Sequence, residues 1–200
     1  MSGEHVASVQ PAESGEGDGQ PSHGSKPDIS SLIYASYGAV TLVGAGAQLL
    51  LGRKPVTPRR AVDTLLQWSL AVNLGLAGLM GFYGHTARAD ETAKSIGFPP
   101  GNPFQFEVAS ASLSFGVLGL LATRLRGLFW WASAISHGVF VLGAAVGHVR
   151  QLRKTGNRSP GNIGGVFYWD IVTPLVHLAL LAASTVMKGA AAPGKRPRSA

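Results

Sequence analysis

The chain has 200 residues, a formal net charge of +7 and no cysteine. Without cysteine it cannot form disulfides, thiolate metal sites, iron–sulfur clusters or covalent haem attachment. The excess of Lys and Arg does not indicate a nucleic-acid partner, because these residues lie in connections between apolar stretches. Anionic lipid and membrane topology explain that placement better.

Residues 1–31 form a segment rich in Gly, Ser and Pro that carries five acidic side chains and one lysine. Such a segment cannot bury enough apolar surface to offset the entropy lost on ordering, so we predict a disordered acidic N-terminal tail. Residues 189–200 are predicted to be a basic, disordered C-terminal tail. Residues 32–188 between them are predicted to form one transmembrane domain.

Five long stretches without Asp, Glu, Lys or Arg follow the acidic tail. A helix needs about 20 mostly apolar residues to span a bilayer, and the helices of a soluble bundle would each need a charged face. We therefore predict an all-α integral membrane bundle of five transmembrane helices, with a buried soluble core as the alternative. The helices are expected at residues 32–51, 65–83, 106–123, 128–149 and 168–187.

The distribution of Lys and Arg predicts the orientation of these helices. Ten of the seventeen lie in the loop between helices 1 and 2, the turn between helices 3 and 4, and the C-terminal tail. The other seven lie in the N-terminal tail and the two remaining loops. This bias predicts a multi-pass protein of the cell inner membrane with its N-terminus outside and its C-terminus cytoplasmic, although the basic loop between helices 4 and 5 opposes it.

Two segments share a pattern in which Gly-His is followed by a polar stretch, Pro-Gly-Asn and a carboxylate. The first covers residues 84–107 and the second residues 147–170. With five spans, both segments lie on one side of the membrane, and helices 2–3 and 4–5 would form a parallel repeat of a hairpin. Helix capping and turn chemistry are the alternative explanation of each segment.

Helical spacing extends the polar character of these segments into the membrane. His137 and His148 are eleven residues apart, and Asp170 and His177 are seven apart, so each pair shares one face of its helix. A third polar stripe consists of Glu107, Ser110 and Ser114. If the three faces converge, they line a polar inlet about 10–15 Å deep.

The run SIGFPPGNPFQFEVASASLSFGVLGLLA (residues 95–122), the two Gly-His pairs and the segment TGNRSPGNIGG resemble an uncharacterised family of small multi-pass bacterial membrane proteins. The likeness covers about residues 70–181 and departs from the family pattern at Phe98, where Trp is common, and Ser112, where Asn is expected. It implies a membrane fold with polar loop motifs and no known reaction. The matching positions are His85, Phe104, Gln105, Glu107, His148, Asn157, Asn162 and Asp170.

Three functions remain open for this chain. The polar site formed by the two loops would bind or pass a small solute, a proton or a redox molecule. Alternatively, the chain would be a non-catalytic accessory subunit of a larger membrane complex. Thirdly, it would be a metal-dependent membrane enzyme, because imidazole and carboxylate groups bind Zn, Fe and Mn.

The residues that would serve these functions are the polar groups of the loops and helix faces. The site candidates are His85, Asn102, Gln105, Glu107, His137, His148, Asn162, Asp170 and His177, with Gln105 taken from the family resemblance. The candidates for a metal are His85, Glu107, His148 and Asp170. No motif assigns a catalytic residue or a cofactor. The expected partners are the lipid bilayer and another membrane protein or a second copy of the chain, with no nucleic acid.

Overall fold

The structure is a computed structural model that describes residues 29–190. Helix α1 (Ile29–Leu50) and helix α8 (Gly165–Ala190) extend by a few residues into the two predicted tails. The rest of each tail lies outside the described residues.

Every regular element of the described chain is a helix. Between α1 and α8 lie α2 (Pro58–Ser69), the π-helix η1 (Leu70–Leu76), α3 (Ala77–Thr86), α4 (Ala89–Ile96), α5 (Phe104–Leu121), α6 (Leu128–Thr155) and α7 (Pro160–Ile163). Five segments are long and apolar enough to cross a membrane, which confirms the predicted all-α, five-helix class. They are Ser31–Leu50, Pro58–Thr86, Phe104–Leu121, Leu128–Thr155 and Pro160–Ala190. The hairpin repeat stays a prediction.

The second span is one continuous rod in three parts, because α2, η1 and α3 follow one another without a gap. It begins where the Thr57 hydroxyl accepts a 3.2 Å hydrogen bond from the Arg60 N–H and Pro58 occupies the first turn. In η1 the backbone bonding widens, so that the Ala77 N–H reaches the Val72 carbonyl five residues earlier. Wide turns of this kind are frequent at functional sites.

The second span and α5 approach each other along glycines of η1, α3 and α5. A Cβ atom added at Gly78 would lie 2.5 Å from the Gly116 nitrogen and 2.6 Å from the Ser112 carbonyl oxygen. A Cβ atom at Gly119 would collide with the backbone of Gly75. Small residues allow such close backbone approach in lipid, so this glycine seam sets the rotation of α5.

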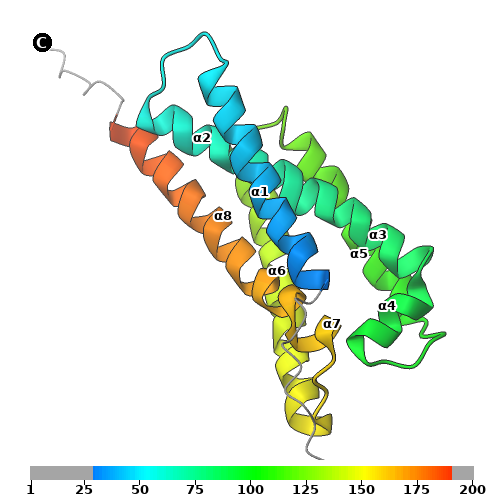
Figure 1. The fold of residues 1–200 in the computed structure, drawn as a ribbon. Helices are drawn as coiled ribbons and strands as arrows, with labels where there is room; N and C mark the ends of the chain where they lie inside the picture. Colours follow the sequence, from blue (N-terminus) through cyan, green and yellow to red (C-terminus); the bar gives the residue numbers. More distant parts are fainter. Residues whose placement is uncertain (1–28, 191–200) are drawn as a thin grey trace, which may run out of the picture.

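Helices α6 and α8 run side by side in opposite directions, and α8 also packs against α1 and α2 (Figure 1). The loop between α1 and α2, the turn between α5 and α6, and the end of α8 lie at one end of the molecule, which we call the C-terminal end. Helices α4 and α7 lie at the opposite end, which we call the α4/α7 end. The loop between the second and third spans and the loop between the fourth and fifth spans therefore share one end, as the number of spans predicted.

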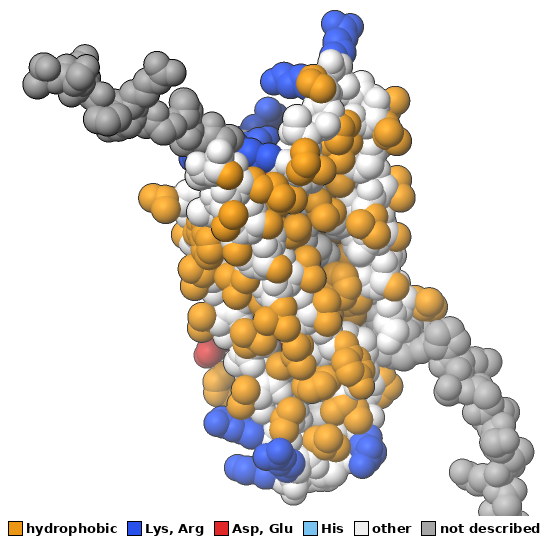
Figure 2. Space-filling model, turned by 90° about the vertical axis from the view of Figure 1, so that its left-hand side faces the viewer, with side chains coloured by type: hydrophobic (Ala, Val, Ile, Leu, Met, Phe, Trp, Pro, Cys, Tyr) orange, Lys and Arg blue, Asp and Glu red, His pale blue; other side chains and the backbone are white. Residues whose placement is uncertain are grey.

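The outer surface is apolar along most of its height. Figure 2 shows a broad hydrophobic belt with Lys and Arg gathered beyond it at both ends. Val43 on α1 and Val139 on α6, for example, are each 71% exposed. A surface of this kind is expected of helices surrounded by lipid. The apolar core beneath it is small and includes Leu66, Leu70, Leu74, Trp130 and Leu181.

Candidate functional site

The α4/α7 end is built by direct contact between the two Gly-His segments, residues 84–107 and 147–170, which we call the first and the second corner. The Asn157 side-chain amide donates a 2.8 Å hydrogen bond to the carbonyl of Ile96, 61 residues earlier in the chain. Gly97 has a φ of +84°, a left-handed conformation that suits glycine, and faces the side chains of Asn157 and Ser159. The convergence of the two loops, which the sequence left open, is therefore present.

The first corner contains a His85–Gln105 pair, joined through His85 Nδ1 and Gln105 Oε1. Gln105 is buried, whereas His85 is half-buried. Asn102 has the role expected of a turn residue, because its Oδ1 accepts a 3.0 Å bond from the Phe104 N–H. Gln105, which only the family resemblance indicated, is thus the residue that ties His85 to α5.

Glu107 does not join the polar interior. It is exposed on α5, and so are Ser110 and Ser114, whose hydroxyls donate to the carbonyls of Phe106 and Ser110 on their own helix. The prediction that this stripe lines the inlet is therefore wrong. The reason is rotational, because α5 turns its glycines towards α3 and leaves the stripe on the outer face.

Asn162 organises the second corner from within α7, where it is fully buried. Its Nδ2 donates to the carbonyl of Asn157 at 2.9 Å and to that of His148 at 3.4 Å. Its Oδ1 lies 2.8 Å from His148 Nδ1. Because carbonyls only accept, the amide is fixed with its oxygen towards the imidazole. His148 Nδ1 must then carry a proton.

This arrangement leaves His148 Nε2 to face Asp170, whose Oδ2 lies 3.7 Å away. Both side chains are largely buried, with 14% and 12% of their surface exposed. Any further proton on this pair resides either on Nε2 or on the carboxylate. The pair can therefore take up and release a proton without losing its bond to Asn162.

A second pair of histidines lies deeper in the bundle. The rings of His137 on α6 and His177 on α8 have centroids 6.3 Å apart, and both residues are buried. His177 Nε2 lies 2.9 Å from the Ser69 hydroxyl on α2. A hydroxyl donates to a bare ring nitrogen and accepts from a protonated one, so Ser69 suits both forms. The predicted faces of α6 and α8 thus converge.

Asn73 belongs to the same group and was missed by the sequence reasoning. Its Nδ2 donates to Ser69 Oγ at 3.0 Å and lies 3.5 Å from Thr41 Oγ1 on α1. Its position inside an uncharged span was the available signal, because polar groups at membrane depth usually have partners. We call Thr41, Ser69, Asn73, His137 and His177 the buried histidine cluster.

Several buried polar atoms along this cluster have no hydrogen-bond partner among the described residues. They include Nδ1 of both His137 and His177, and Oδ1 of Asn73. The hydroxyls of Ser133 and Thr173, each one turn before a histidine of the cluster, also lack a hydrogen-bond partner among the described residues. A buried polar atom without a partner costs about 1–3 kcal/mol. The cluster therefore has several groups free to bind a proton or a small polar species.

The polar groups do not assemble into a metal site. Among residues 29–190, no three His, Cys, Asp or Glu side chains are grouped so as to hold a metal ion. The predicted metal candidates are divided, since His148 pairs with Asp170, His85 bonds to Gln105, and Glu107 faces outwards. The metal-dependent enzyme thus has no ligand set in the described part of the chain.

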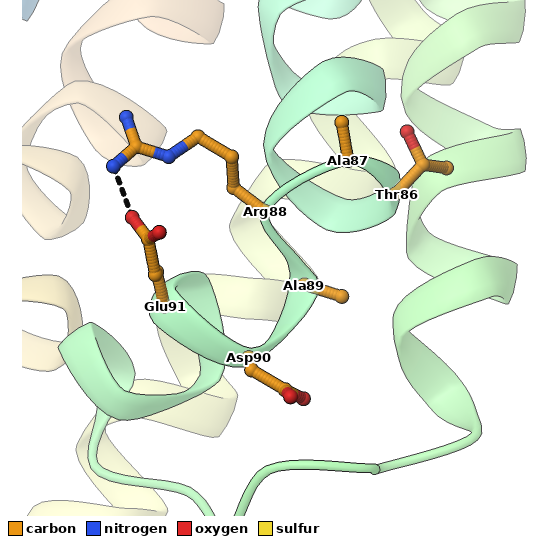
Figure 3. Close-up of a pocket in the computed structure, with 6 residues that line it drawn as sticks. All are labelled: Thr86, Ala87, Arg88, Ala89, Asp90 and Glu91. Atoms are coloured by element: carbon orange, nitrogen blue, oxygen red, sulfur yellow. Dashed lines mark hydrogen bonds and ion pairs between the residues drawn. The ribbon is translucent and has the colours of Figure 1, made fainter.

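A shallow hollow lies where α3 meets α4 (Figure 3). Residues 86–91 supply its lining, and Arg88 and Glu91 form an ion pair beside it. Asp90 accepts a 2.9 Å bond from the Gly101 N–H and ties α4 to the following loop. One short run of chain provides the whole lining, so groups from distant elements do not converge there.

The residues that build this site belong to a part of the sequence that matches a known protein family. A model of a family of unknown function, DUF6790, matches residues 31–190. The chain belongs to this family. The DUF6790 match covers both corners and the buried histidine cluster, and it confirms the resemblance to an uncharacterised family. Comparison with curated proteins and with solved structures gives no match.

Proposed function

We propose that this DUF6790 protein binds or passes a small solute, a proton or a redox molecule from its α4/α7 end, and that the geometry favours the proton. The observation that carries the proposal is the succession of two titratable pairs between α6 and α8. His148 with Asp170 lies near the end, and His137 with His177 lies deeper. Asp170 and His177 are seven residues apart on α8, about 10 Å along the helix.

Proton passage needs groups that take up a proton on one side and release one on the other. Thr173 lies between Asp170 and His177 on the same face of α8, and its hydroxyl is free to accept one proton and give up another. Asp170, when protonated, gives its proton to the Thr173 hydroxyl and becomes a carboxylate, while that hydroxyl passes its own proton to Nδ1 of His177, which has no partner among the described residues. Ionisable groups in membrane interiors commonly mark such relays.

The proposal extends to orientation. We expect the α4/α7 end on the outer side of a bacterial inner membrane and the C-terminus in the cytoplasm, because ten of the seventeen Lys and Arg follow the first, third and fifth spans in the sequence. Cysteines introduced at positions 53–60 should react only with reagents that cross the membrane. Labelling of these positions from outside intact cells would reverse the orientation.

The proposed proton passage is tested in liposomes that contain the purified protein and an entrapped pH-sensitive dye. A potassium gradient with valinomycin imposes the membrane potential. His177→Gln keeps a polar group near Ser69, but an amide cannot take up and release a proton at the pH of the assay. The variant should therefore slow proton uptake by about tenfold or more. Glu107→Gln changes an exposed carboxylate outside the relay and should match the wild type. Wild-type uptake no faster than that of empty liposomes, or unchanged uptake by His177→Gln, would overturn the proposal.

A second candidate function is that of a subunit in a larger membrane complex. The observation that favours it is the outward stripe of Glu107, Ser110 and Ser114 on a helix otherwise suited to lipid. Such polar and small side chains mediate helix contacts in membranes, so we propose that a transmembrane helix of another subunit packs there. Ser110→Cys should crosslink to a partner in native membranes, whereas Val43→Cys on α1 should not. Equal crosslinking at both positions contradicts a specific interface.

A further inference from the structure

A third polar pair lies on α8, near the C-terminal end. The Ser184 hydroxyl donates a 2.5 Å hydrogen bond to Asp63 Oδ1 on α2. The other carboxylate oxygen of Asp63 lies 3.7 Å from the guanidinium Nε of Arg59, one turn earlier on the same helix. The Asp63 side chain is only 21% exposed. A partly buried carboxylate therefore sits between two spanning helices, with α8 covering one side.

This pair continues the polar face that carries the proposed relay. Asp170, His177 and Ser184 follow one another at seven-residue intervals, which places them on one face of α8 about 10 Å apart. Asp170 is paired with His148, His177 with Ser69, and Ser184 with Asp63. The polar face thus extends from the α4/α7 end to the C-terminal end.

An apolar layer interrupts this face between His177 and Ser184. It consists of Leu66 and Leu181, each no more than 2% exposed, and Leu70 belongs to the same apolar cluster. Leu66 follows Asp63 by three residues, and Leu181 precedes Ser184 by three, so the layer lies on the path from Asp63 to the buried histidine cluster. Apolar constrictions exclude water and so block the movement of ions and protons.

Pro174 supplies a place where α8 can bend, three residues before His177 and therefore on the α4/α7 side of the apolar layer. It is fully buried inside α8, between Asp170 and His177, and a Cβ atom added to Gly138 would lie 3.2 Å from its ring. Proline removes one backbone hydrogen bond and is a usual cause of helix kinks. A bend at Pro174 moves the half of α8 that carries Leu181 relative to α2.

We propose that Asp63 is a second proton-exchange site, at the opposite end of the molecule, and that Leu66 and Leu181 form the gate between it and His177. This inference rests on the proposed proton passage and names the group that exchanges the proton at the other end of the path. When the gate opens, water enters the apolar layer, and protonated Asp63 passes its proton through that water to the imidazole of His177 and becomes a carboxylate. Arg59 and the Ser184 hydroxyl stabilise that carboxylate, and the reverse transfer restores the acid.

The test compares two measurements on the full chain in liposomes, namely proton uptake and the ¹⁵N NMR signal of the His177 ring as the external pH is changed. Asp63→Asn should slow uptake by about tenfold or more and leave the response of His177 unchanged. Asp90→Asn, which alters a carboxylate bonded to the Gly101 N–H on the loops, should leave both unchanged. Wild-type uptake in Asp63→Asn overturns the second site while the proposed proton passage stands.

The gate is tested separately, so that the inference does not depend on the folding of one variant. Leu181→Ser places a hydroxyl in the apolar layer and should raise proton uptake severalfold. Uptake equal to that of the wild type overturns the gate. Failure of the proposed function itself gives a different result, because the wild type would then show no uptake and His177 would not respond to pH.

Discussion

Asn162→Ala removes the side chain that holds the second corner together, and the structure sets the size of the effect. The variant loses the 2.9 Å bond to the Asn157 carbonyl and the acceptor 2.8 Å from His148 Nδ1. Asn162 is fully buried, and its former partners His148 and Asn157 are partly buried, so water can replace the lost bonds only in part. At about 1–3 kcal/mol for each unsatisfied group, the expected loss is about 2–6 kcal/mol in the free energy of unfolding.

The matched control is Asn102→Ala, at the equivalent position after Pro-Gly in the first corner. Asn102 loses one 3.0 Å bond to the Phe104 N–H in an exposed turn, so the expected loss is about 0.5–1.5 kcal/mol. Denaturant unfolding in detergent micelles measures both variants. The ¹⁵N NMR spectrum of His148 should show a protonated Nδ1 in the wild type and not in Asn162→Ala. Equal destabilisation by the two variants, or an unchanged His148 spectrum, would refute the assigned role of Asn162.

Two further predictions concern the packing of the bundle and use the same unfolding assay. Gly78→Ala forces a methyl group against α5 and should destabilise the protein by about 1–3 kcal/mol. Gly46→Ala, with no atom within 4 Å of the new methyl group, should be neutral or stabilising by up to about 1 kcal/mol, and the opposite order would contradict the glycine seam. Trp130→Phe keeps a buried ring but loses the 2.8 Å bond from Nε1 to the Ala122 carbonyl, so we expect a loss of about 1 kcal/mol. No measurable change would assign Trp130 to packing alone.

The five spans could be predicted because length without charge is a property of consecutive residues. The common end of the two long loops followed from the number of spans. Pairs on one helix face could also be predicted, since the positions of His137, His148, Asp170 and His177 depend only on helical periodicity. These features need no knowledge of how one helix is rotated against another.

The rest of the candidate site depends on that rotation. The helical spacing of Glu107, Ser110 and Ser114 predicted an inward-facing stripe, whereas the glycine seam between α5 and the second span turns the stripe outwards. Asn73 lies one helical turn after Ser69, but its contact with Thr41 and that of Ser69 with His177 depend on how α1, α2 and α8 pack. Asp63 stands at the border of an uncharged stretch, where a charge is ordinary, and its partner Ser184 is 121 residues away.

The wide turn of η1 has a consequence for the second span as a whole. Each residue of an α-helix advances the chain by about 100°, so deletion of one residue within residues 70–76 would turn α3 by roughly that angle relative to α2. Ser69 would still face His177, but Gly78 would no longer face Gly116. The π-helix therefore acts as a rotational adapter between two half-helices, one fitted to α8 and the other to α5.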